Sequence, residues 1–493
     1  MFDVAIIGGG INGSGAAADA ALRGLSVVLC EEDDLASKTS SSSSKLIHGG
    51  LRYLENWDFY LVQKALNERQ TLLELAPHLI QPMPFVLPHQ HTMRPFWLLR
   101  AGLFIYDHLS RANQLPHTQL INRTEEAAYF KPLNPSINKG FLYYDCQVDD
   151  ARLTIVNAIQ ASLHGAVIKT HTKLIRAEVN KNQWQLTLKS KTAALEIIYA
   201  KSVINAAGPW VEGVNQLLNI PLEYPMRLIK GSHLVVPKLY QGEHAYLLQH
   251  QDKRIVFAIP YHDNTLIGTT DVDFSGDPTD IQIEASEIDY LCSLINGYFN
   301  QSLNKKDILM TWSGVRPLLS TKGKNPSTLS RDYTYHYTNH PAPAVTIYGG
   351  KITTYRQLAL EAIDQLRGIF PNLPNSKTDK TPLPGARTPT MNLTEYQQHA
   401  YKKYDWLDIS TKERYFRNYG TQMEDILKGC TTMADLGTCF SPTLYQAEVD
   451  YLLNHEWADS CDDLLWRRTK LGLSIKTKDK TRLTAYLLKR KNG

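Results

Sequence analysis

The sequence predicts an α/β fold in its N-terminal part, an inserted region of mostly antiparallel β strands, and an all-α C-terminal region. Three observations predict this arrangement. An apolar run at residues 3–7 leads directly into closely spaced glycines and small residues, as in a strand that turns into a helix. Short apolar or alternating stretches dominate residues 226–350. Helical patterns dominate residues 391–493.

The glycines after the first strand have the spacing G-x-G-x-x-G, formed by Gly8, Gly10 and Gly13. The first glycine permits a tight turn, the second lets backbone approach a pyrophosphate, and the third lets the helix pack on the strand. The unpaired N–H groups at the start of that helix favour phosphate. A second strand, residues 26–30, ends at Glu31, whose carboxylate suits ribose hydroxyls and disfavours a 2′-phosphate. The stretch predicts a Rossmann-type domain that binds an adenosine dinucleotide.

The next informative stretch holds five consecutive serines, Ser40–Ser44, before an apolar segment with paired glycines and an arginine at residues 45–54. A serine run alone is typical of a flexible linker. The segment that follows is typical of an ordered loop around a ligand, with hydroxyl and N–H groups available to phosphate or to a flavin edge. The residues leave both interpretations open.

Helix and strand patterns continue along the chain. We expect helices at residues 58–76, 95–109, 151–163 and 284–299, and one that opens after Gly350 and runs to about residue 367. The apolar segment 95–109 fits a core helix or a surface that dips into a membrane, and core burial is the commoner case. Expected strands cover residues 166–169, 173–179, 184–189, 202–208, 233–236, 255–259, 265–268 and 345–348.

Prolines among polar residues at 371–390 predict an interdomain linker, and the chain beyond it has helical patterns. The end of the chain is basic, with one acid, Asp479, among many cations. A solvated helical face and attraction to anionic lipid headgroups both account for this composition. The cations are Arg467, Arg468, Lys470, Lys476, Lys478, Lys480, Arg482, Lys489, Arg490 and Lys491.

Composition excludes several classes of function. A length of 493 residues predicts two or three domains, and 43% hydrophobic with 21% charged residues is ordinary for a soluble globular protein. A net charge of +4 creates no general attraction to nucleic acid. The six cysteines are scattered without C-x-x-C, so we expect no metal site, no disulfide framework and a reducing compartment. We expect neither a signal peptide nor a membrane span.

Polar residues lie at predicted strand ends and in short turns, and the family resemblance given below implies that they face a phosphorylated alcohol. A phosphomonoester is a dianion near neutral pH and suits the planar fork of arginine, which points to Arg316 and Arg331. Surface ion pairing is the alternative role for both arginines. Removing a hydroxyl proton needs a base that titrates near neutrality. His233, beside Lys230, is our choice, and His48 is a rival.

The motifs together resemble the D-amino-acid-oxidase-like family of flavin oxidoreductases, and more closely the FAD-dependent glycerol-3-phosphate dehydrogenases of aerobic bacteria. The likeness covers nearly the whole chain and is least distinctive in the C-terminal third. The serine run departs slightly, because the family often places an alanine within it. The matching segments are Ile7–Gly13, Ser43–Leu54, Arg227–His233, Ile267–Asp271, Ser313–Pro317 and Gly349–Arg356.

This resemblance implies a set of site residues. It implies catalytic roles for His233, Arg52, Arg316 and Lys351, and a substrate pocket that also includes Tyr53, Thr270 and Arg331. It implies FAD binding by Gly8, Gly10, Asn12, Gly13, Glu31, Ser41, Ser44, Lys45, Leu46, Gly208, Gly350 and Thr353.

The expected domains follow the same resemblance. An oxidoreductase domain covers residues 1–375 and a helical domain covers 376–493. Within the first, FAD-binding segments lie near 1–75, 145–215 and 325–375, and substrate segments lie near 76–144 and 216–324.

The implied activity is the oxidation of sn-glycerol 3-phosphate to dihydroxyacetone phosphate, by hydride transfer to FAD and electron transfer to a membrane quinone. The enzyme would then sit peripherally on the cytoplasmic face of the inner membrane, with no nucleic-acid partner. The oligomeric state is open, with a homodimer as one option. Alternatives are a glycerol-3-phosphate oxidase that uses oxygen, an amine or amino-acid oxidase of the same fold, and a flavin-binding sensor without turnover.

Overall fold

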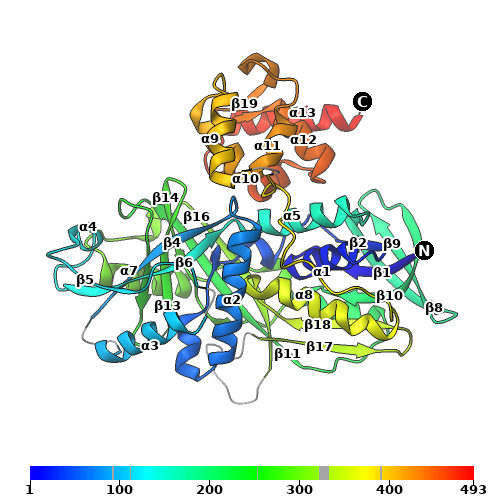
Figure 1. Cartoon of the computed structure of the whole chain (residues 1–493), viewed down its shortest axis with the longest axis horizontal. Coiled ribbons are helices and arrows are strands. Elements are labelled where there is room, and N and C mark those ends of the chain that lie inside the picture. Colours follow the sequence, from blue (N-terminus) through cyan, green and yellow to red (C-terminus); the bar gives the residue numbers. More distant parts are fainter. Residues whose placement is uncertain (91–93, 111–112, 253, 321–331, 389–390, 493) are drawn as a thin grey trace.

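The computed structural model describes residues 1–90, 94–110, 113–252, 254–320, 332–388 and 391–492. Figure 1 shows a body built around two sheets, with the helical C-terminal part, coloured yellow-orange to red, stacked on one side of it. In the part of the chain that is described, no helix combines the length and the apolar character needed to cross a bilayer.

The first sheet has the parallel centre expected of a Rossmann-type domain. Strand β1 (Phe2–Ile7) pairs in parallel with β2 (Val27–Cys30) and β10 (Leu195–Asn205). Further parallel pairing adds β7 (Val167–Lys169) and β18 (Ala344–Gly349). The remaining strands pair antiparallel and are β8 (Thr172–Asn180), β9 (Gln183–Ser190) and β17 (Tyr333–Thr338).

Three helices pack on this sheet: α1 (Ile11–Leu22), α5 (Asp150–Leu163) and α8 (Tyr355–Asp364). Helix α1 is buried almost all round, and its alanines share one core cluster with residues of α5 and α8. A Cβ at Gly15 would lie 2.7 Å from the ring of Tyr355. The small residues of α1 therefore permit the close packing that holds the first turn in place.

The second sheet is mostly antiparallel and forms the inserted region. Its strands run in the order β15-β11-β14-β13-β12-β4-β6-β3, with β16 paired to β11 and β5 paired to β6. These strands are β3 (Leu46–Ile47), β4 (Ile80–Pro88), β5 (Gln119–Asn122), β6 (Lys139–Val148), β11 (Met226–Pro237), β12 (Ala245–Gln249), β13 (Ile255–Tyr261), β14 (Asn264–Gly268), β15 (Val272–Asp273) and β16 (Met310–Leu319).

Helices cover both faces of this second sheet. Helix α7 (Ala285–Tyr298) packs on one face, where Leu234 and Val236 of β11 are buried. Helices α2 (Phe59–Leu75) and α3 (Phe96–His108) pack on the other face with Val235. The alternation along β11 follows from the two-residue period of a strand. The smallest described helix of the body, α4 (Ala127–Phe130), follows β5, and α6 (Val211–Leu217) follows β10.

The C-terminal part is helical with its own core. It contains α9 (Leu393–Lys403), α10 (Ile409–Tyr419), α11 (Met423–Ile426), α12 (Gln446–His455), a π-helical turn (Asp463–Arg468) and α13 (Thr477–Asn492). The one departure from an all-α expectation in its described residues is a small hairpin of β19 (Cys439–Ser441) and β20 (Leu444–Tyr445). Buried tyrosines and leucines, including Tyr415 and Leu452, fill this core.

The first three of the ten basic residues in the C-terminal segment differ from both interpretations of it. Arg468 and Lys470 are buried and Arg467 is largely so, and all three form ion pairs with carboxylates of the chain. They are therefore neither solvated nor available to lipid. The cations Lys476 and Lys478 that follow are exposed.

Candidate functional site

A cavity of about 740 Å³ runs from the turn after β1 to the paired strands β11 and β16 of the second sheet. Residues from both sheets and from the serine run line it. This volume lies within the usual range of small-molecule and cofactor sites, and the position between two sheets is a common one. In the described residues, no group of His, Cys, Asp or Glu side chains is arranged to hold a metal ion.

The turn between β1 and α1 forms one end of the cavity. Gly8 has a φ of +111°, and a Cβ there would lie 2.7 Å from the carbonyl oxygen of Ala206. A Cβ at Gly13 would lie 1.9 Å from the carbonyl oxygen of Gly8, so the helix can approach the turn only with glycine. Gly10, Ile11 and Asn12 line the cavity, which places the start of α1 against it. This end fits a pyrophosphate.

Two polar side chains complete the same end. The Glu31 carboxylate lines the cavity and accepts hydrogen bonds from the N–H groups of Gly9 (2.6 Å) and Asp33 (2.9 Å), while burial raises its pKa. Asn12 donates through Nδ2 to the carbonyl of Gly349 (3.2 Å). Its buried Oδ1 has no hydrogen-bond partner among the described residues, so it remains available to a ligand.

The serine run is an ordered loop. Thr39–Ser41 form a short 3₁₀ helix, and the hydroxyl of Thr39 donates to the carbonyl of Val315 on β16 (2.9 Å). Ser40 accepts from the N–H of Ile11 (2.9 Å) and thereby joins the loop to α1. Ser40, Ser42, Ser43 and Ser44 line the cavity, whereas the carbonyl of Ser41 accepts from the ammonium of Lys45 (3.0 Å). Lys45 itself pairs with buried Asp150 (2.9 Å), and neither of these two residues lines the cavity.

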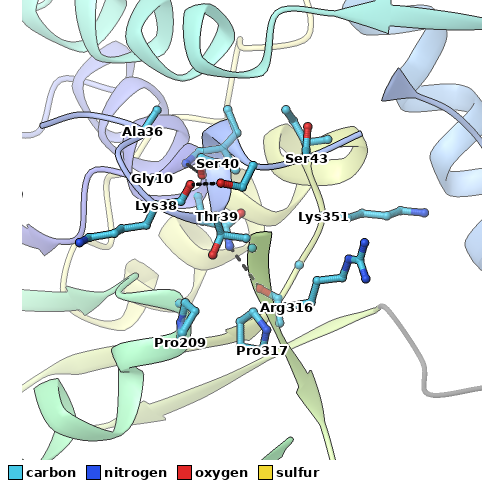
Figure 2. Close-up of a pocket in the computed structure, with 18 of the residues that line it drawn as sticks. Gly10, Ala36, Lys38, Thr39, Ser40, Ser43, Pro209, Arg316, Pro317 and Lys351 are labelled. Carbon is cyan, nitrogen blue, oxygen red and sulfur yellow. Dashed lines mark hydrogen bonds between the residues drawn. The ribbon is translucent and has the colours of Figure 1, made fainter. Parts of the chain in front are cut away.

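Cationic side chains gather at the other end. Arg316 on β16 donates to Asp271 (2.8 Å) and to the hydroxyl of Thr269 (3.0 Å). The ammonium of Lys351 lies 4.9 Å from the ring centre of Tyr53. Figure 2 shows Arg316 and Lys351 on one side of the pocket and Lys38 on the opposite side. An anionic group is therefore favoured at the Arg316 and Lys351 end.

His233 lies behind the cavity wall. Its Nε2 is 2.9 Å from the hydroxyl oxygen of Ser44, and its ring stacks on Trp312. Burial, followed by the charges of Arg316 and Lys45, holds the pKa of His233 well below its usual value. The imidazole is therefore neutral at pH 7 and can accept a proton. His48, the rival base, lines the cavity, and its backbone N–H and carbonyl are both 3.4 Å from the hydroxyl of Thr353.

The other predicted residues divide into two groups. Leu46, Gly208, Gly350 and Thr353 line the cavity. Thr270 does not, because its buried hydroxyl donates to Glu287 (2.6 Å) and accepts from the N–H of Ser232 (2.9 Å). Arg331 lies outside the described residues. Arg52 belongs to a 3₁₀ helix (Leu51–Asn56), but its side chain is not among those that the structure describes.

Several lining residues were not predicted from the sequence. Asp271 follows Thr270 in a polar turn, and Trp210 follows the small-residue turn at Gly208. The ammonium of Lys38 lies 5.7 Å from the ring centre of Trp210. Glycine and polar residues predict a turn at both positions. An Asp or a Trp in a turn, however, has no local sequence pattern that predicts that it lines a cavity.

Comparisons with known proteins agree with this geometry. The family model for the FAD-dependent oxidoreductases matches residues 3–356, and the model for the C-terminal domain of alpha-glycerophosphate oxidase matches residues 376–485. A glycerol-3-phosphate dehydrogenase of Pseudomonas aeruginosa is 48% identical over 491 residues, covering 99% of this chain and 95% of that protein. A D-erythritol 1-phosphate dehydrogenase of Brucella abortus is 44% identical, covering 96% of this chain and 95% of that protein.

Among solved structures, the glycerol-3-phosphate dehydrogenase of Bacillus halodurans complexed with FAD matches with a TM-score of 0.77. It is 26% identical, and the match covers 99% of this chain and 94% of that chain. The similarity therefore extends through the body and the helical C-terminal part.

Proposed function

The chain belongs to the family of FAD-dependent oxidoreductases, and we propose that it oxidises sn-glycerol 3-phosphate to dihydroxyacetone phosphate. The observation that carries this proposal is the pairing of a glycine-turn cofactor end with a cationic end, at Arg316 and Lys351, in one cavity. Relatives named glycerol-3-phosphate dehydrogenase, similar over nearly their whole length, support the substrate.

FAD is the cofactor, and the residues fit it. The glycine turn admits backbone approach, and Asn12 Oδ1 and the start of α1 offer polar groups to the dinucleotide. We assign the contacts to Gly8, Gly10, Asn12, Glu31, Ser44, Leu46, Gly208, Gly350 and Thr353. Gly13, Ser41 and Lys45 act by shaping the turn and the loop. When bound, FAD supplies the two-electron acceptor for oxidation of an alcohol.

The substrate's phosphate would bind the cationic end. Arg316 offers a planar fork and Lys351 a compact charge, and Arg52 and Arg331 complete the proposed set with Tyr53. Asp271 and Thr269 hold the Arg316 guanidinium in position before the substrate arrives. This preorganisation lowers the entropy lost on binding.

The hydroxyl proton would pass to His233. Ser44 lines the cavity and lies within hydrogen-bond distance of Nε2, so its hydroxyl accepts the substrate proton while donating its own to the imidazole. The lowered pKa keeps the imidazole neutral beforehand, and this transfer uses the tautomer in which Nδ1 carries the ring proton. Thr270 contributes through Ser232 and Glu287, by fixing the strand that carries His233.

The proposed electron acceptor is a membrane quinone, and the exposed face of α3 is the proposed membrane contact. Trp97 is 70% exposed and Phe104 is 63% exposed, with Leu98 and Ile105 on the same helix also exposed. The 3₁₀ helix before α2 contacts α3 and ends at Trp57, another exposed aromatic residue. Such a face suits shallow insertion at a lipid interface. We place the enzyme peripherally on the cytoplasmic face of the inner membrane, with a homodimer as the proposed assembly.

The test is anaerobic reduction of the bound flavin. Glycerol 3-phosphate should bleach the flavin's visible absorption band, while glycerol and amino acids should leave it unchanged. D-erythritol 1-phosphate, the substrate in the name of a 44% identical relative, is the necessary comparison. Faster bleaching by D-erythritol 1-phosphate than by glycerol 3-phosphate would identify D-erythritol 1-phosphate as the better substrate. Bleaching by amino acids alone would favour the amine-oxidase alternative.

A second experiment tests the acceptor. During turnover in air, the enzyme should reduce a soluble quinone analogue and release little hydrogen peroxide. Steady peroxide release at the rate of substrate oxidation would assign the oxidase reaction instead.

A further inference from the structure

A short segment of the C-terminal part reaches into the body of the protein beside the serine loop. Residues 467–470 are the last two residues of the π-helical turn and the two that follow it, and they precede α13. Lys470 adopts the left-handed backbone conformation with a φ of +58°. The segment contacts carboxylates on both sides of the loop formed by residues 34–45 (Figure 1 shows the C-terminal part above α5).

The first contact is made at Asp34, at the start of the loop. Arg467 donates through Nε to this carboxylate (2.5 Å), and Arg468 donates through Nη2 to its other oxygen (2.8 Å). Asp34 and Arg468 are both buried. Two residues later, the N–H of Ala36 donates to the carbonyl of Gly9 (3.1 Å), which is in the glycine turn. The arginines therefore fix the chain where it leaves the dinucleotide end of the cavity.

The second contact is made at the end of the loop. The ammonium of Lys470 lies 3.3 Å from the carboxylate of Asp149 and 3.9 Å from that of Asp150. Asp150 in turn accepts from the hydroxyl (2.7 Å) and the N–H (3.2 Å) of Ser43 and from the ammonium of Lys45 (2.9 Å). A chain of direct contacts thus joins the C-terminal part to a residue that lines the cavity.

Lys45, Lys470, Asp149 and Asp150 form a charge-balanced cluster of two ammonium groups and two carboxylates, in which Asp149 is partly exposed and the other three are buried. Burial lowers the pKa of Lys470, and the neighbouring charge of Lys45 acts in the same direction. Although burial opposes it, the Lys470 charge helps to lower the pKa of Asp149. Removing the Lys470 charge would leave an uncompensated buried carboxylate, which proteins relieve by rearrangement or by uptake of a proton.

We propose that segment 467–470 positions the serine loop for FAD, and that Lys470 is a positioning residue acting through Asp149, Asp150 and Ser43. The inference rests on FAD binding and is independent of the substrate and of the electron acceptor. It assigns the C-terminal part a role in cofactor retention, beyond its own packing.

The experiment measures release of FAD from the holoenzyme. Lys470→Met, Lys470→Arg and the control Lys478→Met, an exposed lysine of α13, are diluted into flavin-free buffer. The fluorescence of released FAD gives the dissociation rate, and hydrogen–deuterium exchange of residues 33–45 is followed on the same samples. We expect K470M to release FAD at least roughly tenfold faster, since small displacements of positioning groups have effects of this order or larger.

Further results decide the interpretation. K470R should recover most of the wild-type rate, K478M should behave as wild type, and exchange of residues 33–45 should rise in K470M alone. A K470M holoenzyme with an unchanged FAD release rate and unchanged loop exchange would overturn the proposal, whatever its Tm. If K470M does not accumulate in folded form, Arg467→Gln decides by the same two measurements, because Arg467 contacts the other side of the loop.

Discussion

Arg152 on α5 and Glu456 after α12 form a bidentate ion pair in which both side chains are fully buried. The guanidinium also donates through Nε to the carbonyl of Asn418 (3.2 Å). The pair joins the body to the helical C-terminal part at a position without solvent access. Its removal has a predictable energetic effect.

Glu456→Ala should lower stability strongly, because it leaves the Arg152 charge buried without its partner. The expected loss is about 3–5 kcal/mol, the usual effect of breaking a buried pair. Thermal unfolding followed by calorimetry measures it. Glu178→Ala is the matched control, since its pair with Arg176 is exposed and should contribute at most about 1 kcal/mol. Equal effects of the two variants would contradict the prediction.

His233→Ala should slow flavin reduction while leaving FAD bound. The expected decrease is roughly 10²–10⁴-fold, the usual contribution of a general base. Stopped-flow absorbance under anaerobic conditions measures the rate, with His250→Asn, at the end of β12, as the control. Because burial and nearby cations depress its pKa, wild-type reduction should keep its rate until the pH falls well below 6.5. A flavin reduction rate in H233A within a factor of about three of wild type would contradict the role of His233 and favour His48 as the base.

Arg316→Ala should raise the KM for glycerol 3-phosphate by at least roughly tenfold, because a charge-assisted phosphate contact is lost. Arg316→Lys should recover only part of the affinity, since it keeps the charge and loses the fork. Steady-state kinetics with a quinone analogue gives both constants. Arg227→Ala on the neighbouring strand, whose partner is Asp273 of β15, serves as the control. An unchanged KM in R316A would remove Arg316 from the proposed phosphate site.

His78 should make the protein sensitive to acid. Burial, then the charge of Arg152, lowers its pKa to about 3 from 6.5. As the pH falls below 6.5, the unfolded chain binds a proton that the folded protein does not, so stability decreases through this window towards pH 3 by up to about 1.4 kcal/mol per unit. His78→Gln should show a smaller fall in Tm between pH 7 and pH 5. The exposed His117→Gln should match wild type.

Charges on α3 should weaken membrane attachment. Trp97→Glu and Phe104→Glu each remove an exposed apolar side chain, whose burial contributes about 1.5–3 kcal/mol, so partition onto anionic vesicles should fall roughly tenfold or more. Co-sedimentation measures it. Leu195→Glu, at the start of β10 on the first sheet, is the control. Loss of binding on removal of residues 477–493, with no effect of the α3 variants, would place the contact on α13 instead.

The sequence predicted what local patterns encode. The turn at Gly8–Gly13, the carboxylate of Glu31 and the helices at 59–75, 96–108, 150–163 and 285–298 all follow from short motifs and helical periodicity. Strands were predicted less fully: 233–236 was expected, whereas β11 spans Met226–Pro237, and β4 and β6 were not identified. β4 contains three prolines, including Pro84, and because proline is uncommon within a sheet, its sequence is not typical of a paired strand.

Long-range relationships account for most of what remained unpredicted at the site. His233 was selected for its chemistry, but its position behind Ser44 depends on pairing across 189 residues. Thr270 belongs to a buried group with Glu287 that no local pattern reveals. Arg467 and Asp34, 433 residues apart, meet only after the whole chain has folded. The FAD and substrate contacts assigned from the family resemblance stay predictions.

The contact between Asp34 and residues 467–470 also orders events during synthesis. The glycine turn and the serine loop are synthesised long before the groups that fix both sides of the loop, since Arg467 follows Asp34 by 433 residues. Nascent chains that stop before residue 467 would carry every glycine of the dinucleotide motif and still hold flavin loosely. If segment 467–470 positions the serine loop as proposed, tight FAD binding is a late step, and chains that stop early would retain little flavin on purification.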